Sequence, residues 1–230
     1  MNNVITIFKK QIKDTMKNRV VFMQFLMCPV LAILMEKVMH VEDTPLLFYF
    51  KMMSAMYICF GPLTAMAAII SEEKEKNTLR VLIMSNVKAW QYILGTGLYV
   101  LGMCLIGTIA MAVGTGMPKA DMPIYYGFMM FGLTVSILIG AAIGMYGKNQ
   151  MAAQSISTSV MLVLGFLPTL ATFNKTLQKI AKFLYNQQII DIFNDMSVDN
   201  LGIKGVIILA ASACAAIIVF CISFKKKGLE

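Results

Sequence analysis

Six long apolar runs constrain the fold of this chain more than any other feature. They fall at residues 20–39, 48–70, 92–114, 124–146, 152–172 and 205–224. Each has the ~20 residues that an α-helix needs to cross a bilayer. Because the bilayer core offers no water to backbone N–H and C=O groups, such runs fold as helices, which satisfy these groups internally. We predict an all-α polytopic membrane protein with six transmembrane helices and a single transmembrane domain over residues 1–230.

The composition agrees with this class. Hydrophobic residues make up 58% of the 230 residues and charged residues only 14%, with a mean hydropathy of +0.73, which excludes an ordinary soluble domain. The five cysteines are scattered singly through apolar runs, and the single histidine, His40, has no neighbouring ligand cluster. We therefore expect buried free thiols and no metal site.

Residues 1–19 are predicted to form an amphipathic helix on the membrane surface. Apolar residues recur there at helical spacing: Val4, Ile5, Phe8, Ile12 and Met16. Basic residues cover much of the remaining surface and are expected to meet lipid headgroups: Lys9, Lys10, Lys13, Lys17 and Arg19. The alternative is a secretory signal, but no small-residue cleavage site follows and the next run is long enough to span.

The distribution of Lys and Arg predicts the orientation. If the N-terminus is cytoplasmic, the cytoplasmic connections hold most of these residues and the opposite side is balanced by acids. The positive-inside rule then puts both termini in the cytoplasm of a bacterial cell. The same distribution accounts for the net charge of +8 without nucleic acid as a partner. On the outer side, residues 173–204 carry two amphipathic stripes, which predict short external helices before the last span or, alternatively, an ordinary surface loop.

The sequence lacks the residues that ATP hydrolysis, Ser-His-acid catalysis and ion coupling commonly require. The chain has no GxxxxGK[ST] motif, since Thr108 follows the glycine pair Gly102 and Gly107, and it has no catalytic Ser, His and acid set. We expect no enzyme, no catalytic residue and no cofactor in this chain. The last four runs contain no Asp, Glu, Lys, Arg or His, which argues against ion-coupled transport, although a sodium site of backbone carbonyls remains open. An ATPase partner is then the simplest energy source.

We expect such a partner to bind the charged segment at residues 71–91. Its acids, Glu72, Glu73 and Glu75, alternate with lysines and are expected to extend a helix as a solvated rod. Asn77 can end that helix and Thr78 can cap the next. Residues of the second helix are divided between a shared apolar face (Leu79, Leu82 and Ile83) and groups for contacts (Arg80, Lys88 and the interfacial Trp90). A positive-inside loop of a channel or receptor is the alternative.

The run from Glu73 to Leu82, followed by Ser85-Asn86-Val87, resembles the cytoplasmic motif of ABC-2 transporter permeases, Glu-x-Glu-x-Gly-Thr-Leu-Glu before a Pro-containing turn. Glu73, Glu75, Thr78 and Leu79 match; Asn77 replaces the glycine, Arg80 an acid, and Asn86 stands near the proline. The resemblance extends to the topology of the whole chain, with an N-terminal elbow helix and paired external helices. It implies that residues 71–91 form a coupling helix on a nucleotide-binding subunit, with ATP and Mg²⁺ bound in two copies of that partner.

The combined expectation is a permease subunit, in a homodimer or heterodimer, that exports a hydrophobic or amphipathic compound, drug or peptide. Six of the 21 methionines are candidates for an adaptable cavity: Met103, Met111, Met129, Met130, Met145 and Met161. Gly140 and Gly144 are in GxxxG register, which serves either internal packing or a dimer seam. Two alternatives stay open: export of a lipid-linked or polysaccharide cargo, and a non-transporting membrane anchor or immunity protein.

Overall fold

The computed structural model of the chain describes residues 2–39, 45–171, 173–197 and 202–227. These residues are all helix and connection, with no strand among them. Six helical stretches have the length and hydropathy to cross a membrane: Val21–Val38, Phe48–Glu75, Ala89–Gly114, Met122–Tyr146, Gln150–Ala171 and Gly202–Lys225. The predicted fold class is therefore confirmed. His40 and part of the predicted external segment, residues 198–201, lie outside the described residues.

The helices follow one another with short connections. In chain order they are α1 (Asn2–Lys17), α2 (Arg19–Val38), α3 (Phe48–Glu75), α4 (Thr78–Met84), α5 (Ala89–Gly114), α6 (Met122–Tyr146), α7 (Gln150–Met161), a π-helical turn (Leu162–Phe166), α8 (Leu167–Ala171), α9 (Lys175–Ala181), α10 (Tyr185–Asp195) and α11 (Gly202–Lys227). The fifth span is thus made of α7, the π-helical turn and α8. The fourth and sixth spans are unbroken helices.

Helix α3 is the centre of the bundle. Its most apolar stretch is 89% buried, whereas that of α11 is only 17% buried. Helices α2, α5, α6 and α7 all pack against α3. Gly140 and Gly144 of α6 allow a close approach to α3, because a Cβ at Gly140 would lie 2.4 Å from the backbone oxygen of Leu63. The glycine pair therefore serves packing between α3 and α6 within the chain.

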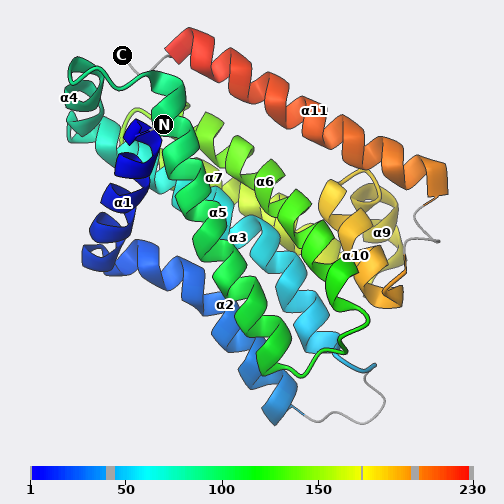
Figure 1. Cartoon of the computed structure of the whole chain (residues 1–230). Helices are drawn as coiled ribbons and strands as arrows, with labels where there is room; N and C mark the ends of the chain where they lie inside the picture. Colours follow the sequence, from blue (N-terminus) through cyan, green and yellow to red (C-terminus); the bar gives the residue numbers. More distant parts are fainter. Residues whose placement is uncertain (1, 40–44, 172, 198–201, 228–230) are drawn as a thin grey trace.

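The two ends of the bundle differ in what they carry. Figure 1 shows both ends of the described chain and α4 at one end, and α9 and α10 at the other. Helix α1 crosses the first of these ends instead of running alongside the long helices (Figure 1). We call this end, with α1 and α4, the α4 end.

The two short helices near residues 173–204 are present, as the stripes predicted. In α10 the stripe is buried, including Ile189, Ile192 and Phe193. In α9, Ile180 is exposed, so its stripe is covered only in part. Helix α10 packs against α3, α6, α8 and α11, and so closes one end of the bundle.

Candidate functional site

The turn between α3 and α4 forms where the sequence indicates it. Helix α3 continues past its apolar part to Glu75, and Asn77 then adopts a left-handed conformation with φ of 56°. Asparagine tolerates this conformation better than most residues with a Cβ. Helix α4 begins at once with Thr78. The result is a short helix joined to the central helix of the bundle by two residues.

Glu73 is the most buried charged residue at this end, with 7% of its surface exposed. Its Oε1 forms an ion pair and a hydrogen bond with Lys10 of α1. The same oxygen accepts a hydrogen bond of 2.8 Å from the neutral Nε2 of Gln11. Lys10 also lies 3.1 Å from Asp14. Burial alone would lower the pKa of Lys10, but its bonds to Glu73 and Asp14 outweigh burial and raise the pKa. Lys10 therefore stays charged at neutral pH.

The neighbouring side chains of α3 reach other helices. Glu72 accepts from Nδ2 of Asn18 at 3.1 Å, where α1 meets α2. Lys74 donates to the backbone oxygen of Met145 at 2.7 Å, near the end of α6. Glu75 accepts from the backbone N–H of Gln150 at 2.8 Å, at the start of α7. The last turn of α3 is therefore bonded to α1 and to the connection between α6 and α7.

The predicted solvated rod is wrong for Glu73, which is buried, whereas Glu75 and Lys76 are exposed. Glu73 faces the bundle, and the partners of the α3 acids come from this chain. The missed residues are the neutral amides Gln11, Asn18 and Gln150. A signal existed for Gln11, because it lies four residues from both Ile7 and Thr15, and all three form the buried face of α1.

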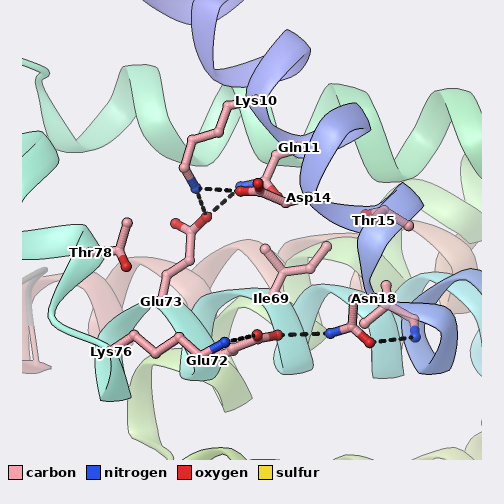
Figure 2. Close-up of a pocket in the computed structure, with 11 residues that line it drawn as sticks. Lys10, Gln11, Asp14, Thr15, Asn18, Ile69, Glu72, Glu73, Lys76 and Thr78 are labelled. Carbon is pink, nitrogen blue, oxygen red and sulfur yellow. Dashed lines mark hydrogen bonds and ion pairs between the residues drawn. The ribbon is translucent and has the colours of Figure 1, made fainter.

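A cavity of about 820 Å³ opens beside this cluster, between α1 and the end of α3. Figure 2 shows Lys10 and Gln11 reaching Glu73 from α1, while Asn18 and Lys76 both meet Glu72. Asp14, Thr15 and Thr78 complete the polar wall, and Val21 and Ile69 are its apolar part. None of the six candidate methionines lines this cavity.

Those methionines lie on three spans. Met111, Met129, Met145 and Met161 are buried, Met103 is half-buried and Met130 is exposed. Buried positions in well-packed helices fit a role in the core. A substrate cavity at these residues stays a prediction.

The residues predicted for docking divide by exposure. Leu79 is buried and Leu82 and Thr78 are half-buried, so they hold α4 against the bundle, while Asn77 and Arg80 are exposed. The side chain of Ile83 is outside the described set. Val81 and Met84, which were not among the residues predicted for docking, are 61% and 81% exposed. Together with Arg80 they form the outer face of α4.

Helix α1 presents three faces. Ile7, Gln11 and Thr15 are buried against the bundle, and Ile5, Ile12 and Met16 are exposed apolar residues on another side. Lys9 and Lys13 are exposed, whereas Lys10 turns toward Glu73. The side chains of Lys17 and Arg19 lie outside the described set, and Trp90 is half exposed. An exposed apolar stripe next to lysines suits a membrane surface, and headgroup contact by these residues stays a prediction.

Among the described residues no group of three or more His, Cys, Asp and Glu is placed to hold a metal ion.

Comparison with known proteins identifies the family. No curated protein matches the chain. A scan against protein families matches residues 9–225 to the ABC-2 family transporter protein. Because this match covers nearly the whole chain, the protein belongs to the ABC-2 family of transporter membrane proteins.

Proposed function

We propose that this chain is the transmembrane permease subunit of an ATP-driven exporter. ABC-2 membrane domains are typically permeases without ATPase activity, and they generally pair with ATP-binding subunits. In this proposal two copies of such a subunit, which bind ATP and Mg²⁺, work with a homodimer or heterodimer of permease chains. The cargo is a hydrophobic or amphipathic compound, drug or peptide, and it leaves the cell.

The bonding of the last turn of α3 carries this proposal. Helix α4 is attached to α3 through two residues, so a push on α4 acts directly on Glu72–Glu75. These residues bond to α1, α6 and α7. Charge-assisted bonds resist stretching more than neutral ones. A displacement of α4 is therefore passed to several helices together, which a solvated loop would not achieve.

The outer face of α4 supplies the contact with the partner. Val81 and Met84 are exposed apolar side chains beside Arg80. Residues 77–90 contain basic residues and no acid. A partner groove with an apolar floor and acidic rim fits this face, because buried apolar anchors give binding energy and rim charges give orientation. Leu79, buried beneath, keeps α4 in place.

The positions of charged residues in the spans support a hydrophobic or amphipathic cargo. The Asp, Glu, Lys and Arg residues of the described spans lie near the ends of these spans, such as Glu36 in α2, Lys51 in α3 and Lys204 in α11. Charged side chains inside the membrane commonly mark the path of an inorganic ion or a highly charged solute. An amphipathic molecule does not, and it can also enter from the lipid.

Co-purification tests the proposal. The chain is co-expressed with candidate ATP-binding subunits from the same genome, and any purified complex is assayed for ATP hydrolysis. Met84→Asp and Arg80→Glu are each expected to reduce recovery of the ATP-binding subunit and ATPase activity at least tenfold, the effect of losing about 1.4 kcal/mol of binding. Lys119→Glu, an exposed charge change between α5 and α6, is the control and leaves both unchanged.

Two results would overturn this function. If no ATP-binding subunit binds the unmodified chain, the protein is a membrane anchor or immunity protein instead. If the subunit binds but both α4 variants retain normal activity, the partner docks elsewhere. A double variant, Glu73→Ala with Glu75→Ala, should bind the subunit yet export no cargo, because docking persists while transmission through α3 is lost.

A further inference from the structure

Two buried oxygen atoms at the α4 end have no hydrogen-bond partner among the described residues: Oε2 of Glu73 and the hydroxyl of Tyr92. Lys10 and Gln11 both donate to the other oxygen of Glu73, Oε1, and Figure 2 shows Oε2 turned away from them. Tyr92 of α5 lies beside Glu73 without a hydrogen bond to it. Glu73 also lines the cavity between α1 and the end of α3. Because unpaired buried polar atoms are unfavourable, a donor from outside the chain would be stabilised there.

The charges of the cavity wall favour a ligand with a cationic donor. Three acids and two lysines line the cavity: Asp14, Glu72, Glu73, Lys10 and Lys76. Both lysines are already paired, Lys10 with Glu73 and Lys76 with Glu72. An anion alone would compete for these lysines and leave Oε2 of Glu73 unpaired. An ammonium group, by contrast, donates up to three hydrogen bonds and can reach both unpaired oxygens.

Two smaller occupants fit the cavity less well. Its volume of about 820 Å³ is many times the ~30 Å³ of one water molecule and within the ~300–1,000 Å³ of ligand sites. A hard metal ion takes six or more oxygen ligands, and among the described residues no group of three or more His, Cys, Asp and Glu is placed to hold a metal. The ligand is therefore expected to be an organic molecule with an ammonium group.

The cavity also joins polar to apolar surface at the depth of lipid headgroups. Its apolar part consists of Val21, where the first span begins, and Ile69, near the end of the second. Glu73 lies four residues beyond Ile69, which is about 6 Å along the helix axis. The headgroup layer of one leaflet is similarly thick, roughly 5–8 Å. A lipid whose glycerol lies beside Ile69 would therefore place its headgroup at Glu73.

We propose that the cavity between α1 and the end of α3 binds a phospholipid with a primary ammonium headgroup, phosphatidylethanolamine, from the leaflet at the α4 end. The ammonium donates to Oε2 of Glu73 and to the hydroxyl of Tyr92. The phosphate meets Lys76, whose side chain is 66% exposed and can turn from Glu72. The bound lipid ties α1 to α3. This proposal does not depend on export or on an ATP-binding subunit, so the two proposals can fail separately.

Native mass spectrometry of the purified chain in detergent tests the ligand. The chain is titrated with phosphatidylethanolamine or with phosphatidylcholine of the same acyl chains, whose quaternary ammonium has no N–H. Phosphatidylethanolamine is expected to bind at least about tenfold more tightly, because only its ammonium can donate to Glu73. Equal affinity for the two lipids overturns the site. Displacement of the lipid by equimolar free ethanolamine would show a site for small amines and overturns the lipid.

A variant of Glu73 tests the contact with the ammonium. In Glu73→Gln the amide oxygen stays with Lys10 and Gln11, so the amide NH₂ takes the place of Oε2 and opposes another donor. Affinity for phosphatidylethanolamine should fall about tenfold. Glu75→Gln is the matched control, because it removes the same charge from the same turn of α3 at an exposed position outside the cavity wall. An equal loss in both variants overturns the specific role of Glu73.

Tyr92→Phe keeps the proposal testable if Glu73→Gln does not fold. The hydroxyl of Tyr92 has no partner within the described chain, so its removal should leave the unfolding midpoint in lipid-free detergent unchanged. Affinity for phosphatidylethanolamine should fall about threefold, because one acceptor of the ammonium is lost. A lower midpoint with unchanged affinity would show that Tyr92 donates directly to Glu73. That result overturns the proposal, since Oε2 would then need no ligand.

Discussion

Glu73 occupies a buried position where another helix, α1, supplies the partners of its carboxylate. Lys10 and Gln11 follow one another on α1 and bond to the same carboxylate oxygen. Gln11 in turn lies 3.5 Å from the hydroxyl of Thr96 on α5. Removing one member of a buried pair leaves the other without compensation. The stability of the α4 end therefore depends on this carboxylate more than on the exposed acids near it.

Replacement of Glu73 by leucine tests this dependence. We expect Glu73→Leu to lower the free energy of unfolding by about 2–3 kcal/mol, below the ~3–5 kcal/mol of a fully buried pair, because Lys10 is partly exposed and keeps Asp14. Glu73→Gln should lose less, since it can still accept from Gln11. Thermal unfolding in detergent measures both. Equal stability of the leucine variant and the unmodified chain would contradict the role assigned to Glu73.

At the scale of elements, the sequence was sufficient for the number and type of helices. Apolar runs give membrane spans because the bilayer imposes their length and their internal hydrogen bonding. It was not sufficient for packing. The α3 and α11 runs are both strongly apolar, yet one is central and the other peripheral, since lipid and protein interior are equally apolar neighbours. The direction of Glu73 depends on partners on α1, far away in the chain, and of these only Gln11 left a local pattern.

The contact between α3 and α6 gives a prediction with an internal control. A methyl group at Gly140 would meet the backbone of Leu63, whereas at Gly127 of the same helix nothing lies within 4 Å. Gly140→Ala is expected to destabilise the protein by about 1–3 kcal/mol through overpacking. Gly127→Ala should be neutral or add up to about 1 kcal/mol, because alanine loses less backbone entropy in a helix. Unfolding midpoints of the two variants decide it, and a Gly140→Ala variant as stable as Gly127→Ala would refute the close contact.

For the whole molecule, an even number of spans agrees with both described chain ends lying at the α4 end (Figure 1). Lys9, Lys13 and Arg80 are exposed there, and the positive-inside rule predicts that this end faces the cytoplasm. At the other end the connection from α5 to α6 exposes Lys119. These two positions therefore predict opposite access to a reagent that cannot cross the membrane.

Cysteine labelling in intact cells tests this orientation. Lys119→Cys should react with a membrane-impermeant maleimide from outside, and Arg80→Cys should react only after the cells are opened. The unmodified chain is the control for its own thiols, of which Cys214 and Cys221 are exposed on α11. Reaction of Arg80→Cys from outside would invert the topology and put α4 out of reach of ATP. Because ATP-binding subunits work in the cytoplasm, that single result would contradict both the orientation and the coupling role of α4.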